Sequence, residues 1–95
     1  MKIRWVHLAL DDLREIDKYI SKDSPATAKK LLTLIWETTQ LLKEHPHIGR
    51  PGRVSGTREL VISGTPFIIP YRVASGEIQI LRVIHGARNW PIKFD

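Results

Sequence analysis

The fold is decided by residues 9–42, which read ALDDLREIDKYISKDSPATAKKLLTLIWETTQLL. Apolar residues recur there at intervals of three and four, a spacing that places them on one side of a helix. The pattern is interrupted at Asp23-Ser24-Pro25, where Ser24 can cap a new helix and Pro25 suits the first turn, which needs no N–H. The stretch therefore predicts two helices joined by a short turn, an antiparallel helical hairpin.

The first helix has one apolar stripe, and two acidic residues lie near its start. The stripe consists of Ala9, Leu13, Ile16 and Ile20, with Tyr19 at its flank. Asp11 and Asp12 suit the positive end of the helix dipole. These features predict a helix that buries one side against a sheet.

The second helix carries a wider apolar surface and is expected to end near His45-Pro46. Its inner stripe consists of Ala28, Leu31, Leu32, Ile35, Thr39 and Leu42. Leu34, Trp36 and Leu41 extend the apolar surface beyond what one helix contact requires. We interpret these three residues as the lining of a groove for an amphipathic segment of a partner protein.

Four other stretches have the character of strands: residues 2–7, 57–62, 67–74 and 78–85. Short turns join the last three, which predicts an antiparallel meander. The order of strand, two helices and three strands predicts an α+β fold in which the helical hairpin covers one face of the sheet. Because 95 residues leave no room for a second core, we expect a single domain spanning residues 1–95.

Two segments interrupt this regular pattern. Residues 47–56 contain three glycines, a proline and two arginines, Arg50 and Arg53, which predicts an irregular basic loop. Pro70 lies inside the stretch 67–74, where it cannot donate a ladder hydrogen bond. That strand is therefore either an edge strand at Pro70 or interrupted by a bulge.

Composition restricts the partners and the compartment. The chain has a net charge of +5 and no cysteine, which favours negatively charged partners and excludes a disulfide framework and a thiolate zinc site. His45 and His47 stand in a loop without further metal ligands nearby, so we expect no metal and no other cofactor. No apolar run approaches the ~18 residues of a membrane span, so neither a signal peptide nor a membrane partner is expected, and the cytoplasm is the predicted location.

Six segments of the chain resemble the RelE/ParE toxin superfamily of bacterial type II toxin–antitoxin systems. They are ALDDL at residues 9–13, SPA at 24–26, HPHIGR at 45–50, GTREL at 56–60, TPFIIPYRV at 65–73 and ILRVIHGAR at 80–88. The resemblance implies a toxin that arrests bacterial growth, as in plasmid stabilisation, unless a cognate antitoxin covers it. It further implies that operator DNA is reached only through the antitoxin.

The superfamily divides by target. RelE-like members are mRNA interferases that act in the ribosome, whereas ParE-like members inhibit DNA gyrase without a chemical step of their own. His85 followed by Arg88 and Asn89 is similar to the end of ParE-like members, and Ile68 stands where we place an arginine of the nucleases. We therefore favour gyrase, with ribosome-dependent mRNA cleavage as the alternative and a non-toxic antitoxin-binding regulator as a third possibility.

Candidate site residues follow from charge, position and resemblance. Under the nuclease alternative, His85 would act as acid or base with Arg82 and Arg88 stabilising negative charge. The residues expected to contact the target are Arg50, Arg53, Arg58, Arg72, Arg82, His85, Arg88 and Trp90. Arg58 and Arg72 could instead pair with Glu59 or Glu77 across strands, His85 could be structural, and Trp90 could pin the tail to the body. Arg50, Arg53, Arg82 and Arg88 have no acidic partner close in sequence, which makes them the stronger candidates.

Overall fold

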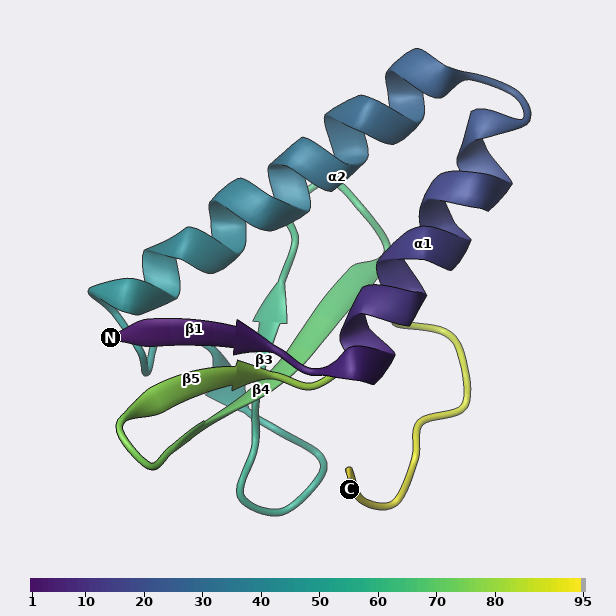
Figure 1. Ribbon diagram of the computed structural model, residues 1–95. Helices are drawn as coiled ribbons and strands as arrows, with labels where there is room; N and C mark the ends of the chain where they lie inside the picture. The colour runs from purple at the N-terminus through teal and green to yellow at the C-terminus, as the bar shows by residue number, and fades with distance from the viewer. Residues whose placement is uncertain (95) are drawn as a thin grey trace.

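The computed structural model describes residues 1–94 and contains two α-helices on a mixed sheet (Figure 1). The helices are α1 (His7–Ser21) and α2 (Pro25–Gln40), and a 3-10 turn, η1 (Leu41–Lys43), follows α2. The strands are β1 (Lys2–Trp5), β2 (Arg50–Pro51), β3 (Arg58–Val61), β4 (Phe67–Ala74), β5 (Glu77–Ile80) and β6 (Ile84–His85). The predicted α+β order and the predicted helical hairpin are confirmed.

The sheet has the strand order β1-β5-β4-β3-β2, with β6 paired to the first residues of β4. β3, β4 and β5 form the predicted antiparallel meander. β1 pairs with the outer edge of β5 in parallel, so that Ile3 lies beside Ile78 and Trp5 lies beside Ile80. The first strand of the chain and the last strand of the meander are therefore neighbours.

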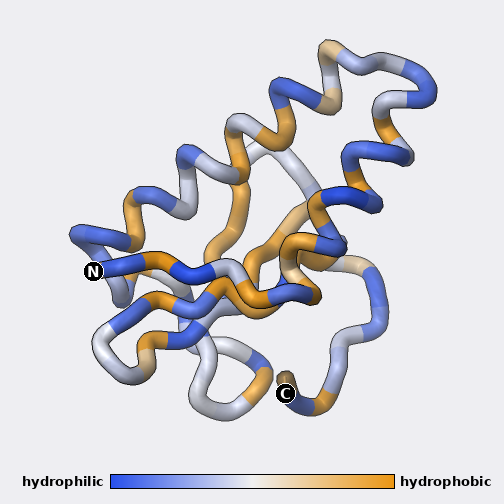
Figure 2. The backbone as a smooth tube through the Cα atoms, in the orientation of Figure 1, coloured by the Kyte–Doolittle hydropathy of each residue, from blue (hydrophilic) through white to orange (hydrophobic). Residues whose placement is uncertain are grey.

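The core lies between the helical hairpin and one face of the sheet, where the apolar stretches of the chain gather (Figure 2). Its fully buried members include Ala9 and Ile35 from the helices and Ile69, Tyr71 and Ile80 from the strands. By alternation along the strands, residues such as Arg4, Glu59 and Arg72 point to the opposite face. That face carries polar side chains and is not covered by the helices.

The helix boundaries follow local chemistry. Ser24 caps α2 as predicted, since its Oγ accepts a hydrogen bond from the Thr27 N–H at 3.1 Å, and Pro25 occupies the first turn. α1 begins at His7 and has no acidic residue in its first turn, so the expected dipole role of Asp11 and Asp12 is wrong. Asp12 instead accepts hydrogen bonds from Arg82 and Val83, which lie between β5 and β6.

Two sequence predictions about regular structure need correction. Residues 47–56 are not wholly irregular, because Arg50–Pro51 pairs with Glu59 and Arg58 as strand β2. The predicted last strand, residues 78–85, is divided into β5 and β6. Between the pairs Tyr71–Ile80 and Ile68–Ile84, β4 advances by three residues and the opposite chain by four, which defines a bulge.

The bulge explains how Pro70 fits inside a central strand. The Pro70 carbonyl accepts from the Leu81 N–H at 3.0 Å, so the backbone of Pro70 faces the segment between β5 and β6. Its missing N–H thus falls where the ladder is already interrupted. Of the two alternatives, the bulge is correct, and its extra residue lies in the segment between β5 and β6, opposite β4.

Candidate functional site

A cleft of about 430 Å³ lies between α1 and the chain that follows β5. We call it the α1 cleft. Its lining comprises Asp12, Glu15, Ile16, Tyr19 and Ile20 of α1, together with Phe67, Arg82, Val83, Ile84, His85, Arg88, Asn89 and Pro91. Arg82, His85 and Arg88, predicted as the possible catalytic group, are therefore brought together at one site.

Arg82 is tied to α1 by two hydrogen bonds to one carboxylate. Its Nε lies 2.7 Å from Asp12 Oδ2 and its Nη2 lies 3.0 Å from Asp12 Oδ1. The Val83 N–H, freed by the bulge, also donates to Asp12 Oδ2 at 2.8 Å. The hydrogen bonds to Asp12 raise the pKa of the Arg82 guanidinium, against the smaller opposing effect of burial. The sequence offers no acidic partner close to Arg82, and the structure supplies one 70 residues away.

His85 is fixed at the end of β6 by its own turn. Its Nδ1 accepts a hydrogen bond from the Ala87 N–H at 3.1 Å, which places the proton of the neutral ring on Nε2. The ring also meets the ring of Phe67 edge to face, with centroids 5.9 Å apart. In this arrangement His85 is a hydrogen-bond donor through Nε2, and its Nδ1 lone pair is already engaged.

Arg88 is the cation of the α1 cleft whose guanidinium has no carboxylate within 4.0 Å in residues 1–94. Its backbone is held, since its N–H donates to the His85 carbonyl at 3.0 Å. The side chain is therefore positioned at the cleft while its guanidinium donors remain available to a binding partner.

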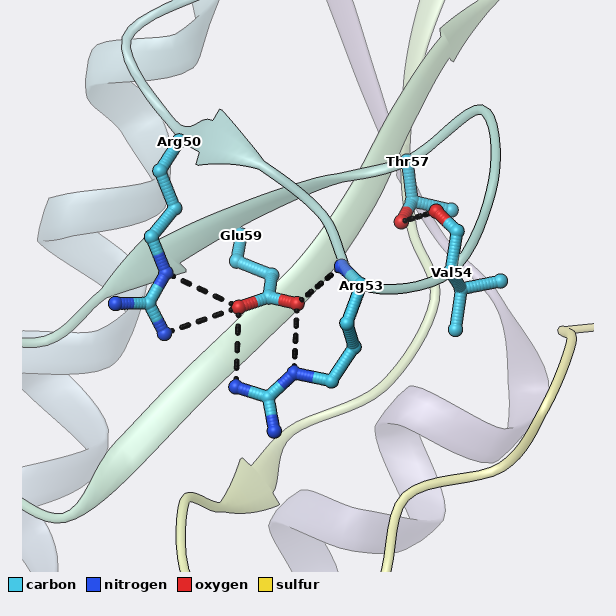
Figure 3. Close-up of polar contacts among 5 residues, drawn as sticks. All are labelled: Arg50, Arg53, Val54, Thr57 and Glu59. Atoms are coloured by element: carbon cyan, nitrogen blue, oxygen red, sulfur yellow. Dashed lines mark hydrogen bonds and ion pairs between the residues drawn. The ribbon is translucent and has the colours of Figure 1, made fainter.

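A second cluster is centred on Glu59, whose side chain is only 3% exposed (Figure 3). Arg50 approaches one carboxylate oxygen through Nε at 3.1 Å and Nη2 at 3.0 Å. Arg53 donates to the carboxylate through its backbone N–H at 2.8 Å, through Nε at 3.0 Å and through Nη2 at 3.3 Å. Burial by itself raises the pKa of Glu59, but the bonds from Arg53 and Arg50 outweigh it and hold the pKa below its ordinary value.

The Glu59 cluster corrects a further prediction. Arg50 and Arg53 are not without an acidic partner, because β2 pairs with β3 and brings them to Glu59. The guanidinium of Arg53 also lies over the indole ring of Trp90, with Cζ 3.7 Å from the ring centroid. Of the two possibilities left open for Trp90, this contact supports the one in which it pins the tail to the body.

Within residues 1–94, Arg58 and Arg72 form no ion pair with a carboxylate, so the alternative in which they pair with Glu59 or Glu77 is wrong. Arg58 Nη1 donates to the carbonyls of Gly49 at 2.8 Å and His47 at 3.3 Å. Arg72 Nε donates to Gln79 Oε1 at 2.7 Å. Both side chains line a smaller hollow of about 300 Å³ beside Pro51. The eight predicted target residues thus fall into three groups, the α1 cleft, the Glu59 cluster with Trp90, and this hollow.

The apolar residues predicted to line one groove are exposed but do not share one side of α2. The exposed fractions are 39% for Leu34, 57% for Trp36 and 53% for Leu41. Leu34 and Trp36 are two positions apart, which is about 200° around a helix, so they flank the buried stripe on opposite sides. The prediction of exposed apolar residues holds, whereas a single groove containing all three is not formed.

Sequence reasoning missed the α1 side of the cleft. Asp12, Glu15 and Tyr19 follow one another at intervals of three and four, the spacing that sets residues on one helix flank. Tyr19 is 76% exposed there. The spacing was visible in the sequence, but only the tertiary structure shows that the last strand lies opposite.

Metal-binding and membrane-spanning features are absent from the part of the chain that the structure describes. Within residues 1–94, no three His, Asp or Glu side chains converge on a point that could hold a metal ion. No helix in this range has the length and apolar character to cross a bilayer.

Sequence comparison identifies relatives over almost the whole chain. The family model described as the ParE toxin of the type II toxin–antitoxin system parDE matches residues 3–90. The protein named "Putative toxin Y4kP" of Sinorhizobium fredii is 46% identical over 90 residues, which cover 95% of this chain and 93% of that one. Toxin RelE2 of Caulobacter vibrioides is 36% identical over 87 residues, 92% of this chain and 97% of that one.

Structural comparison identifies the same group of proteins. A chain of the chromosomal ParDE system from P. aeruginosa superposes with a TM-score of 0.80 at 36% identity, covering 90% of this chain and 95% of that chain. The toxin–antitoxin complex RelBE2 of Mycobacterium tuberculosis gives a TM-score of 0.60 at 24% identity, covering 88% and 95%. The second likeness is one of fold.

The fold and these relatives define the class of the protein as a type II toxin of the RelE/ParE superfamily. Within that class, the chain belongs to the ParE toxin family, whose model covers both helices and all of the strands except Lys2 of β1.

Proposed function

We propose that the protein arrests bacterial growth by binding DNA gyrase, without a chemical step of its own, and that a cognate antitoxin neutralises it. The observation that carries the non-enzymatic part is the state of the possible catalytic group. Arg82 is bound through two nitrogens to Asp12, and the His85 Nδ1 lone pair is occupied by the Ala87 N–H. A ribonuclease needs a free base for the 2′-hydroxyl and unpaired cations for the phosphorane.

The target surface in this proposal combines the α1 cleft with the Glu59 cluster. Arg88 contributes the available guanidinium of the cleft, while Arg50 and Arg53 keep nitrogens that Glu59 does not use. Trp90 joins the two regions through its contact with Arg53. Arg58 and Arg72 belong to the proposed surface as a separate basic group. Because gyrase is an intracellular enzyme, this proposal places the toxin in the cytoplasm.

Ribosome-dependent mRNA cleavage is the second candidate, since one relative at 36% identity is named Toxin RelE2. In that case His85 would be the acid or base, and Arg82 would have to leave Asp12 to stabilise the phosphorane. Replacing His85 with alanine would then lower mRNA cleavage by about 10²-fold or more.

Arg88→Ala is expected to weaken growth arrest, because it removes the cation of the α1 cleft that has no carboxylate partner in residues 1–94. A charged hydrogen bond to a target contributes about 1.5–3 kcal/mol, so the toxin dose needed for arrest should rise roughly ten- to a hundredfold. The measurement is growth after graded induction, with toxin levels compared by immunoblot.

Arg14→Ala is the matched control, because it also removes one positive charge, from α1 outside the cleft lining, and within residues 1–94 Arg14 pairs with Asp11 on the surface. Its toxicity should equal that of the wild type. Equal toxicity of Arg88→Ala and wild type would contradict the assignment of Arg88, and a wild type that never arrests growth would favour the antitoxin-binding regulator.

For the antitoxin we propose contacts with the exposed apolar residues of α2 and η1. Leu34 and Leu41 are seven positions apart and lie on nearly the same side, so one apolar segment could cover both. Leu34→Ala and Leu41→Ala should each weaken antitoxin binding, measured by calorimetry, by roughly tenfold. Unchanged affinity in both variants would remove α2 from the antitoxin interface, and Thr33→Ala on the same helix serves as control.

A further inference from the structure

The C-terminal segment, residues 86–94, is tied to the body by backbone bonds only at its beginning. The Gly86 N–H donates to the Pro66 carbonyl at 2.7 Å, and the Arg88 N–H donates to the His85 carbonyl at 3.0 Å. From residue 89 to residue 94 the described chain forms no further backbone-to-backbone hydrogen bond. The position of this part therefore depends on side-chain contacts.

Trp90 makes the contact that fixes the segment. It stacks on the Arg53 guanidinium, 3.7 Å from Cζ to the ring centroid. Arg53 cannot easily follow a departing indole, because Glu59 binds its backbone N–H and two of its side-chain nitrogens. The anchor on the body is thus rigid, and movement is confined to the segment.

The attached position of Trp90 combines a stabilising contact with a destabilising one. Its Nε1 is buried and has no hydrogen-bond partner within residues 1–94. A cation–π stack stabilises the attached state, whereas an unpaired buried N–H destabilises it by a comparable amount. The unpaired N–H therefore offsets part of the stabilisation that the stack provides, so we expect the released position to be a minor but populated state.

The same segment forms one wall of the α1 cleft. Arg88, Asn89 and Pro91 face Glu15 and Tyr19 of α1 across it. In Figure 1 the segment leaves the sheet beside α1 and curves back toward the loop after β2. Detaching Trp90 would remove this wall.

We propose that residues 86–94 form a latch that walls one side of the α1 cleft when Trp90 stacks on Arg53 and opens that side when Trp90 is released. Opening uncovers the apolar floor made by Ile20, Phe67 and Ile84. Any molecule that binds the open cleft shifts the latch toward release. The Glu59 cluster has a second role in this device, since it holds the Arg53 anchor in place.

The latch is tested by tryptic cleavage of the full-length protein at the Arg88–Asn89 bond, followed by mass spectrometry. The attached segment is held on both sides of this bond, by the Gly86 N–H and by Trp90. Because a protease binds its substrate as an extended chain, faster cleavage reports a larger open population. Trp90→Ala and Arg53→Met should each raise the rate at this bond about five- to tenfold, the loss expected from one stack. Trp90→Phe keeps an aromatic face and removes the unpaired N–H, so its rate should stay near or below that of the wild type.

Arg50→Met is the matched control, because Arg50 shares Glu59 with Arg53 but Trp90 stacks on Arg53. Its cleavage at Arg88 should equal that of the wild type. Wild-type rates in Trp90→Ala and Arg53→Met would overturn the latch, as would an equal increase in Arg50→Met. If cleavage after Lys18 in α1 rises in parallel, the variants have unfolded globally, and Trp90→Phe then decides: cleavage as fast as in Trp90→Ala overturns the proposal.

Discussion

Replacing Asp12 with alanine is expected to lower the free energy of unfolding by about 3–5 kcal/mol, the usual effect of breaking a partly buried charge pair from one side. Arg82 would lose both of its carboxylate bonds, and the Val83 N–H at the bulge would lose its acceptor. The side chains of Asp12 and Arg82 are 17% and 30% exposed, so water replaces these bonds only in part. Urea denaturation at neutral pH measures the change.

The neighbouring Asp11 supplies the control for this prediction. It pairs with His7 and Arg14 on the surface and is 44% exposed. Asp11→Ala should therefore cost less than about 1 kcal/mol. If Asp12→Ala proves no more destabilising than Asp11→Ala, the bonds between α1 and the bulge do not contribute to stability as described.

Glu59→Gln should lower the free energy of unfolding at pH 7 by about 3 kcal/mol, because two arginines lose the buried carboxylate that joins them. The variant should also respond less to acid. The folded pKa of Glu59 is lowered, so its contribution to stability is complete above the unfolded pKa of about 4.3 and is lost as the pH falls through the lower folded pKa.

The measurement is thermal or urea unfolding of wild type and variant from pH 7 downward. The difference between the two curves should be constant near neutrality and shrink below about pH 4. Glu77→Gln is the control, because the pKa of Glu77 is also lowered, mainly by its hydrogen bond from Arg4, yet the pair lies at the surface. A Glu59→Gln curve parallel to the wild type at all pH values would contradict the assigned pKa direction.

Local patterns were sufficient to predict most of the fold. The apolar stripe ending at Ile20, the Ser24 cap and the wider stripe of α2 correspond to the two observed helices. The stretch 67–74 agrees with β4. These features depend on residues within a few positions of one another, and such interactions are visible in a sequence.

The bulge and the charge pairs could not be predicted, because both depend on distant segments. Pro70 predicted an interruption of the strand ladder. Only the pairing of β4 with β5 and β6 shows that the extra residue lies in the segment opposite β4. Asp12 and Arg82 meet across 70 positions. Arg50 reaches Glu59 only because a two-residue strand forms inside a loop rich in glycine.

The candidate site was predicted in part for the same reason. Arg82, His85 and Arg88 lie near one another in sequence, so their grouping at the α1 cleft follows once the last strand is placed. Their chemistry could not be predicted from the sequence. It depends on Asp12, which binds the Arg82 guanidinium, and on the Ala87 N–H, which binds His85 Nδ1. Trp90 was recognised as distinct, but its contact with Arg53 required the tail to fold back.

The most direct test of the account is a gyrase supercoiling assay with the purified toxin, run beside a translation-coupled mRNA cleavage assay. We expect inhibition of supercoiling that the cognate antitoxin reverses, with no codon-positioned cuts in the translated message. The His85→Ala variant should still inhibit gyrase, weakened only by the loss of one contact in the α1 cleft. Cleaved message together with unaffected supercoiling, and loss of cleavage in His85→Ala, would contradict the proposed target.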